Sequence, residues 1–291
     1  MAHLIEHGPN VLVVASPSGP KGFDLALIAA LQERANVEII NYASPFVARD
    51  NTHVVVNRAI TEGNQHITDL KYFEQQTGIR VTNPLDAAAR SRDKRTYPTD
   101  YSGLVVETEI CSNLEEILDC AHRFGRDVVV KGPEGYQSNE LAKYTGETDI
   151  AEVQKVLGNI TKQVVVQPFI PQFVSTQIRV VACRDSCGEH HVLGAYRRVP
   201  APGDWKTGPV WEGMYVEHSI TEAERALGIE VAKRSNLDFI GMDLGYLDNK
   251  PTLIETNSSP GGIGLQRHIP QASERYAELV VHLATVTHSG S

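Results

Sequence analysis

The amino-acid sequence predicts a chain of mixed α/β and α+β class, and two observations lead to this prediction. In the N-terminal part, short apolar strands alternate with amphipathic helices, which indicates a mostly parallel sheet with helices on its faces. In the later part, strands follow one another through turns, which indicates antiparallel hairpins. The length of 291 residues suits about two domains. A hydrophobic share of 41% with a charged share of 22% excludes a disordered or fibrous chain.

The N-terminal part ends at the turn Asn83-Pro84. Its predicted strands are 11–15, 37–40, 53–56 and 79–81, and its predicted helices are 23–34 and 68–76. The first of these helices is indicated by apolar residues at helical spacing between Phe23 and Leu31. The loop that precedes it joins strand to helix without the glycine pattern of dinucleotide-binding proteins.

Beyond Asp86 the pattern changes to strands joined by turns, with three helices between them and a last helix after a glycine-rich loop. The predicted strands are 127–131, 163–167, 177–183, 191–199, 239–247 and 252–257. Two helix starts carry capping-box patterns, Ser112 with Glu115 and Ser219 with Glu222, and the third helix is predicted near 150–157. The segments on either side of 184–189 are expected to pair as a hairpin.

The charge balance excludes several classes of partner. Lys and Arg number 27 against 36 Asp and Glu, a net charge of -9, whereas a nucleic-acid or anionic-membrane surface needs a positive field. No uncharged apolar run approaches the roughly 20 residues of a membrane span, and the N-terminus lacks a signal-peptide pattern. The four cysteines are too sparse for a disulfide scaffold. We therefore expect a cytoplasmic protein with no nucleic-acid or membrane partner.

The segment 242–257 carries the clearest chemical pattern. Its tract Asp-Asn-Lys-Pro predicts a turn between two strands, and pairing that is symmetric about Asn249 places Asp243 opposite Glu255. Because side chains alternate along a strand, Asn257 shares the face of Glu255. Two carboxylates and an amide oxygen on one face suit Mg²⁺. The alternative is an ordinary polar hairpin face, but opposed acidic side chains repel each other without a cation.

Basic residues earlier in the chain and a glycine-rich loop directly after this hairpin add to the pattern. Lys131 ends an apolar strand before a glycine-containing turn, where it can reach a phosphate or simply be exposed to solvent. Arg179 lies between two apolar residues, an alternation that places it on the polar face of its strand. Arg197 and Arg198 are adjacent and point to opposite faces, so only one of them can face the site. The loop 258–264 is dense in glycine, so its backbone N–H groups can approach an anion, although it can equally be a tight connection.

The order of these parts resembles the ATP-grasp superfamily, and most of all its carboxylate–amine ligases of the RimK and lysine-biosynthesis type. The motif Glu255-Thr256-Asn257-Ser258-Ser259-Pro260-Gly261, with Asp243 upstream, carries most of the resemblance. The segment Ser91-Arg92-Asp93-Lys94 and the strand-end Lys131 add to it in the right order. The resemblance implies an N-terminal α/β (pre-ATP-grasp) domain over 1–86. It further implies an ATP-grasp fold of two lobes, 87–170 and 171–291, with ATP between two antiparallel sheets.

The resemblance also implies roles for individual residues. Lys94 and Lys131 would hold the phosphates under the loop that contains Gly135, and Gln167, Phe169 and Ile170 would receive the adenine. Arg198 and Arg179 would stabilise the transferring phosphate, and Asp243, Glu255 and Asn257 would bind Mg²⁺, for which Mn²⁺ can substitute. Ser259, Gly261 and Gly262 would line the acceptor carboxylate, with Lys206 and Arg267 bordering the substrate. The loop after the first strand can approach the substrate in this family, which adds Ser18 and Lys21.

The activity that the resemblance implies is amide-bond formation between a carboxylate and an amine. It proceeds through an acyl phosphate and releases ADP and phosphate. The expected substrates are a small amino acid or peptide, with a carrier protein or peptide as another source of the amine, and a homo-oligomer is expected. A kinase-type phosphotransferase and a non-catalytic ATP-binding regulator are the alternatives. The chain departs from the family pattern in two places. Pro168 follows Gln167, where relatives usually carry an acidic residue that contacts the adenine. The segment 204–213, which borders the substrate, does not match the usual motif and puts glutamate and aminoadipate as substrates in doubt.

One further cluster resembles a zinc knuckle. Cys183 and Cys187 precede His190 and His191 at a spacing that could suit four ligands. The two histidines are neighbours on a strand and therefore point to opposite faces. A solvated turn is the favoured interpretation.

Overall fold

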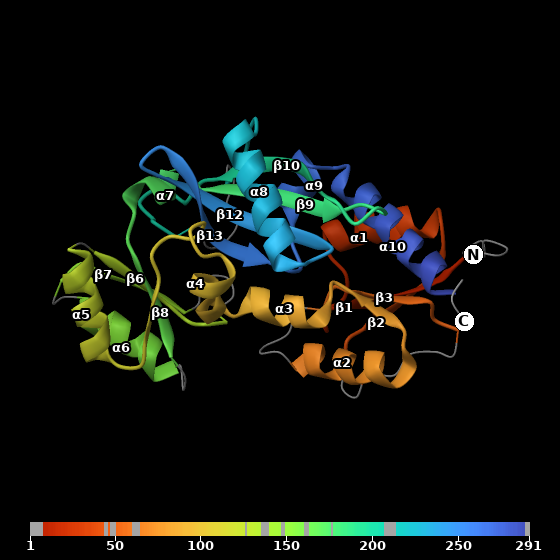
Figure 1. Ribbon diagram of the computed structural model, residues 1–291, viewed down its shortest axis with the longest axis horizontal. Helices are drawn as coiled ribbons and strands as arrows, with labels where there is room; N and C mark the ends of the chain where they lie inside the picture. Colours follow the sequence, from red (N-terminus) through yellow and green to blue (C-terminus); the bar gives the residue numbers. More distant parts are fainter. Residues whose placement is uncertain are drawn as a thin grey trace.

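The computed structural model describes residues 8–43, 46, 51–59, 65–125, 127–134, 140–146, 149–159, 163–175, 177–206 and 214–288. Figure 1 shows three sheets arranged along the long axis of the molecule, with helices on their outer faces. In the described part of the chain, no helix combines the length and apolar character that crossing a membrane requires.

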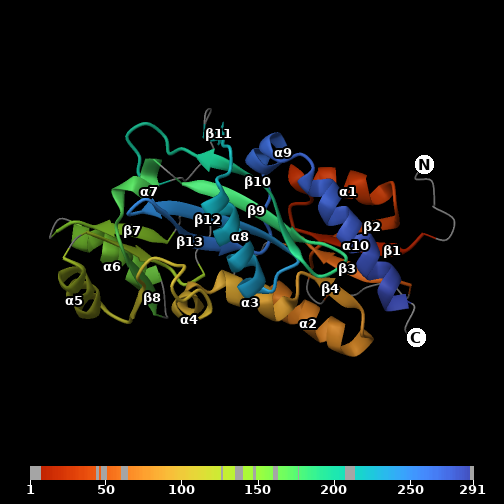
Figure 2. The ribbon, with the colours of Figure 1, turned by 45° about the horizontal axis from the view of Figure 1, so that its top comes forward.

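The N-terminal lobe is built on a parallel sheet in the order β2-β1-β3-β4, as the alternation of strands and helices predicts. Its strands are β1 (Asn10–Ala15), β2 (Asn36–Asn41), β3 (Val54–Asn57) and β4 (Arg80–Thr82). The helices α1 (Phe23–Gln32) and α10 (Ala272–His288) cover one face, and α2 (Gln65–Thr77) covers the other (Figure 2). Val11 to Ala15 of the central strand β1 are buried, as expected of a strand that helices cover on both sides.

The central sheet is antiparallel, in the order β11-β10-β9-β12-β13. It contains β9 (Ile178–Arg184), β10 (His190–Arg198), β11 (Tyr215–Glu217), β12 (Phe239–Leu247) and β13 (Lys250–Asn257). The helix α8 (Glu222–Ser235) packs on one face (Figure 1), and α9 (Ile263–His268) follows β13. The hairpin expected around 184–189 is present as β9 and β10.

The third sheet belongs to a separate lobe, the lid lobe, and is also antiparallel, in the order β5-β8-β6-β7. Its strands are β5 (Glu109–Cys111), β6 (Val128–Lys131), β7 (Leu141–Tyr144) and β8 (Val164–Pro168), and its helices are α5 (Leu114–Phe124) and α6 (Ile150–Asn159). The connection from the N-terminal lobe runs through α3 (Leu85–Arg92), a 3₁₀ turn η1 (Lys94–Thr96) and α4 (Tyr97–Asp100). The short α7 (Pro171–Ser175) leads from the lid lobe into β9.

Both predicted helix caps are wrong by one or two residues. The helix α5 is capped by Asn113, whose side chain accepts from the Glu116 N–H at 3.0 Å, and not by Ser112. The helix α8 begins with a capping box between Thr221 and Glu224, two residues after Ser219. In both places neighbouring residues offer the same spacing of polar side chains, so the pattern alone cannot separate the alternatives.

Candidate active site

A cavity of about 1260 Å³ lies between the three sheets. The N-terminal lobe contributes the loop after β1 and the residue after β3, the lid lobe contributes β6 and the end of β8, and the central sheet contributes β9, β10 and β13. Predicted site residues that line it are Lys94, Lys131, Gln167, Phe169, Ile170, Arg179, Arg198, Lys206, Glu255, Asn257, Ser259, Gly261 and Gly262, together with Ser18 and Lys21. The structure thus brings residues from all three lobes to one place.

The hairpin of β12 and β13 pairs Asp243 with Glu255, as predicted, but by a different route. The turn consists of Asp248 and Asn249 alone, both with positive φ, and Lys250 already pairs in the strand. From this two-residue turn a regular ladder would place Asp243 opposite Ile254. The register shifts between Asp243 and Leu244, and this irregularity brings Glu255 opposite Asp243.

Asp243 is 1% exposed and is held by two arginines. Arg179 lies directly opposite it on β9 and donates from Nε to Oδ1 and from Nη2 to Oδ2, the second at 2.9 Å. Arg198 of β10 donates from Nη1 to Oδ2 at 2.9 Å, whereas its neighbour Arg197 is exposed. Burial alone would raise the pKa of Asp243, but the two guanidinium groups lower it to about 2. Asp243 is therefore ionised throughout the physiological pH range.

The other two residues of the predicted metal set lie beside this cluster. Asn257 accepts from the Ser259 N–H through Oδ1 at 2.9 Å, which orients its side chain. Between Glu255 and Asn257, Thr256 points away and is held by Ser91 and Tyr97 through hydroxyl contacts of 2.8 and 2.9 Å. This contact fixes the strand that carries both cavity residues.

The donor set is one that a hard cation prefers, because it consists of oxygens only. A carboxylate offers about four acceptor positions, and the arginines use three on Asp243. In the described residues, no cluster of three or more His, Cys, Asp or Glu could hold a metal, so a cation here depends on the Asn257 amide as well as on Glu255 and Asp243.

Lys131 lies at the lid-lobe side of the cavity and donates to Gln167 Oε1 at 2.7 Å. Gln167 in turn donates to Thr108 at 2.9 Å, which fixes the amide with its oxygen toward the lysine. Burial, together with the nearby Lys94, lowers the pKa of Lys131 to about 8, although the carboxylates of Glu255 and Asp243 oppose this. Two ammonium groups brought together in this way suit an anionic ligand.

Aromatic and apolar side chains form part of the cavity wall near the lysines. Phe169 contacts the ring of Trp205 edge-on, with 5.7 Å between the ring centroids. The Lys143 ammonium lies 3.9 Å from the centre of the Phe169 ring. Ile170 is buried behind it. Aromatic and apolar side chains in a cavity wall can pack against a planar heterocycle. Gly135, predicted to cover the phosphates, lies outside the described residues.

The comparison with protein families decides the classification. Residues 99–274, more than half of the chain, match the RimK-like ATP-grasp domain. The chain belongs to the RimK-like ATP-grasp family. The antiparallel sheets on either side of the cavity are the two lobes of this ATP-grasp fold, as the sequence predicts.

Curated relatives of this family are named probable alpha-L-glutamate ligases. The protein from Stutzerimonas stutzeri is 29% identical over 202 residues, which cover 68% of this chain and 65% of that protein. The protein from Shewanella frigidimarina is 26% identical over 204 residues, which cover 68% of this chain and 66% of that protein. The matched segment thus spans slightly less than two thirds of the length of these relatives.

Solved structures share the fold over almost the whole chain. A D-cycloserine synthetase superposes with a TM-score of 0.76 at 18% identity, covering 96% of this chain and 99% of that one. The D-alanyl-alanine synthetase A of Vibrio cholerae gives 0.76 at 15% identity, covering 98% and 100%. The RimK domain ATP-grasp protein of Sphaerobacter thermophilus gives 0.70 at 16% identity, covering 94% and 99%. At these identities the likeness concerns the fold.

Two of the residues that the ATP-grasp resemblance placed at the substrate have other surroundings. Lys206 lines the cavity, but its Nζ donates to the Leu141 carbonyl of the lid lobe at 2.8 Å, so it joins two walls of the site. Arg267 is exposed on α9 and is not part of the cavity wall. The structure therefore does not bring Arg267 to the site.

Arg58 and Asp24 line the cavity from the N-terminal lobe, although no sequence motif singled them out. Arg58 donates from Nε to Asp24 Oδ1 at 2.7 Å and is 3% exposed. A signal was available, because Arg58 directly follows the buried strand β3. Ligands of open α/β sheets bind at the carboxyl ends of the strands.

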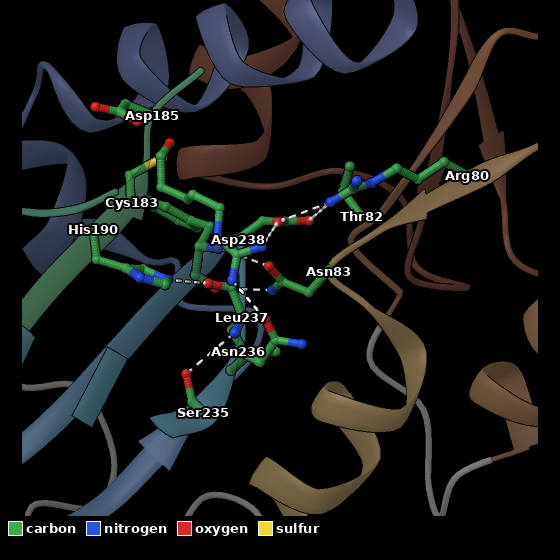
Figure 3. A network of polar contacts seen from close by, with 12 residues as sticks. Arg80, Thr82, Asn83, Cys183, Asp185, His190, Ser235, Asn236, Leu237 and Asp238 are labelled. Atoms are coloured by element: carbon green, nitrogen blue, oxygen red, sulfur yellow. Dashed lines mark hydrogen bonds and ion pairs between the residues drawn. The ribbon is translucent and has the colours of Figure 1, made fainter. Parts of the chain in front are cut away.

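The histidines and cysteines of the zinc-knuckle pattern each have separate surroundings. His190 Nε2 is 2.8 Å from the Leu237 carbonyl (Figure 3), whereas His191 Nε2 is 2.7 Å from Asp185. Cys183 is buried and Cys187 is exposed. The four side chains therefore do not converge on one point.

Proposed function

We propose that this chain is an ATP-dependent ligase that joins a carboxylate to an amine through an acyl phosphate and releases ADP and phosphate. The observation that carries the proposal is the pairing of Asp243 with Arg179 and Arg198 beside Glu255 and Asn257, in a cavity that Lys131 also lines. Phosphoryl transfer needs positioning and neutralisation of charge more than covalent help. The relatives named glutamate ligases and the shared ATP-grasp fold support this activity.

In the proposed mechanism, Lys94 and Lys131 bind the phosphates, and the cavity wall at Phe169 and Ile170 binds the adenine. Asp243, Glu255 and Asn257 would hold Mg²⁺, which neutralises phosphate charge when bound. The substrate carboxylate attacks the γ-phosphorus, and the bond to the leaving oxygen of ADP breaks. The amine then attacks the acyl carbon, phosphate leaves, and the amine loses a proton. Arg198 neutralises charge on the transferring group in both steps.

We further propose an amino acid or short peptide as the substrate. The cavity is wide enough to hold a second ligand beside the nucleotide, and the curated relatives are named for joining glutamate. Pro168 follows Gln167 at the position where relatives usually have an acidic adenine contact, so nucleotide binding depends more on the aromatic wall at Phe169 and Trp205. The amine can also be carried by a peptide or a carrier protein. We propose in addition that the chain forms a homo-oligomer, which light scattering tests.

The test is an ADP-release screen over amino acids and dipeptides, followed by mass measurement of the product. ADP release that needs both a carboxylic acid and an amine, with a product lighter than their sum by one water, supports the ligase. ADP release with a phosphorylated acid and no role for an amine would identify a phosphotransferase. ATP binding without turnover across the whole panel would identify a regulator.

Glu255→Ala is the first variant to combine with this screen. We expect ADP formation to fall by about 100-fold or more, because the variant removes a charged oxygen ligand from the phosphate site. Glu278→Ala, in an exposed pair with Arg275 on α10, is the matched control and should retain full activity. A fully active Glu255→Ala variant would refute the metal assignment.

A further inference from the structure

The loop from Ser258 to Gly262, here called the substrate loop, is held from the N-terminal lobe by two side chains. Asn83 donates from Nδ2 to the Ser258 carbonyl at 2.6 Å, and Arg58 donates from Nη2 to the Pro260 carbonyl at 2.8 Å. The two carbonyls flank Ser259, which lines the cavity. Both contacts are to backbone, so they constrain the path of the loop whatever its side chains are.

Asn83 is completely engaged in this contact. Its Nδ2 also donates to the Phe239 carbonyl at 2.8 Å, and its Oδ1 accepts from the Phe239 N–H at 2.7 Å. The Asn83 side chain is 4% exposed and packs beside the first residue of β12, close to Asp238 (Figure 3). A single amide therefore joins the first residue of β12 to the loop that follows β13. These are the two strands that carry Asp243 and Glu255.

Arg58 is likewise held by contacts on several sides. Its Nε donates to Asp24 at 2.7 Å, its guanidinium carbon lies 5.3 Å from the centre of the Phe23 ring, and it is 3% exposed. The ion pair neutralises the buried charge, and the planar guanidinium can therefore donate to Asp24 and to Pro260 at the same time. An ammonium group on a lysine stem lacks this fork of donors.

Packing holds the substrate loop on its other sides. A Cβ added at Gly241 of β12 would lie 2.8 Å from Pro260 Cβ, so Pro260 sits directly on the strand. A Cβ at Gly261 would lie 3.1 Å from Arg58 Nη2, and one at Gly22 would lie 3.7 Å from the backbone of Gly262. Within the described part of the chain, the N–H groups of Gly261 and Gly262 make no hydrogen bond.

We propose that Asn83 and Arg58 are positioning residues that hold the substrate loop, so that its backbone N–H groups are fixed toward the bound carboxylate. The proposal rests on the proposed ligase function for the nature of that ligand. Neither side chain needs to touch a reacting atom, because each acts through a carbonyl of the loop. Donors that are fixed before the reaction stabilise developing negative charge without reorganisation. The N-terminal lobe thereby takes part in the geometry of a site whose Asp243, Glu255 and Lys131 lie on the other lobes.

The first arm of the test is hydrogen–deuterium exchange of the substrate loop in Asn83→Ala, Asn83→Asp and Arg58→Lys, compared with the wild type. We expect exchange at Ser259, the loop amide that donates to Asn257 Oδ1, to rise by about tenfold in Asn83→Asp, since a carboxylate of the same size cannot donate to the Ser258 and Phe239 carbonyls. Tyr276→Phe is the matched control, because it removes a buried contact to Thr82 at the same lobe interface without touching the loop. Folded Asn83 and Arg58 variants with unchanged loop exchange would overturn the proposal.

The second arm is kinetic. We expect KM for the carboxylate substrate to rise about tenfold and kcat to fall in the Asn83 variants, with ATP affinity within about twofold of the wild type. Arg58→Lys should show a smaller effect of the same kind. Loss of ATP affinity in step with kcat would indicate general unfolding of the site and would overturn a positioning role. A wild-type chain without ligase activity would refute the proposed function, while the exchange measurements would still test the hold on the loop.

Discussion

Among single residues, Asp243 shows how the site balances its charges. Its three hydrogen bonds from Arg179 and Arg198 lower its pKa to about 2 in the folded chain. The ordinary value in an unfolded chain is about 3.9. The stability that these pairs contribute is therefore fully present above about pH 4, and it is lost as the pH falls toward 2. The two guanidinium groups thus face the carboxylates of both Asp243 and Glu255, which balances the charge of this cluster.

Lys131 leads to a prediction at the same scale. Its pKa of about 8 means that the ammonium loses its proton as the pH rises above 8, so the affinity of the free protein for ATP should fall between about pH 7.5 and 9.5. Lys131→Arg should remove this dependence, because a guanidinium stays charged. Lys131→Met should weaken binding across the range. Calorimetric titration with ATP at several pH values measures the effect, and a wild-type affinity that is flat over this range would contradict the assignment.

At the scale of elements, the hairpin of β12 and β13 shows what the sequence could predict. The residue types and the short turn tract were enough to pair Asp243 with Glu255. The true turn is shorter than predicted, and a register shift after Asp243 compensates for it. Such irregularities depend on packing against neighbouring strands, which local sequence does not reveal. Asn83 was recognised only as the end of a lobe, because its partners Phe239 and Ser258 lie far away in the chain.

The turn of this hairpin carries its own prediction. Asn249 has φ of +62°, a left-handed conformation that costs an ordinary L-residue about 1–2 kcal/mol. Asn249→Ala should therefore lower the free energy of unfolding by about 1 kcal/mol, whereas Asn249→Gly should leave it unchanged or raise it slightly. Urea unfolding of the two variants measures the difference. Equal stability of the alanine and glycine variants would show that the turn does not need this conformation.

For the whole molecule, the distribution of the core separates the lid lobe from the rest. The lid lobe has a core cluster of its own, which includes Ile117, Val130 and Val166. The N-terminal and central sheets share two clusters, one of which joins Leu12 of β1 to Val180 of β9. The same shared cluster includes Ala88, Tyr97 and Tyr101. We therefore propose that 1–86 and 171–291, with the start of 87–170 packed on them, behave as one unit, and that the lid sheet with α5 and α6 is the other. Hydrophobic periodicity predicts which faces are buried, but it does not identify the partner of each face.

The contact between the N-terminal sheet and the central sheet leads to a prediction about stability. Asp238 is fully buried and accepts from Arg80 of β4 at 3.1 Å (Figure 3). It also accepts from Arg184 of β9 at 3.4 Å. Asp238→Ala leaves Arg184, which is 20% exposed, without its carboxylate and should cost about 3–5 kcal/mol. Arg80→Ala leaves Asp238 paired with Arg184, and Arg80 is 35% exposed, so its cost should be about 1 kcal/mol.

Denaturant unfolding of both single variants and the double variant measures the coupling between Arg80 and Asp238. Because Arg80 has lost its partner in Asp238→Ala, adding Arg80→Ala to that variant should cost less than Arg80→Ala costs in the wild type. Equal costs in the two backgrounds would mean that the ion pair does not join the lobes. In that case the shared apolar core alone would hold the N-terminal lobe against the central sheet.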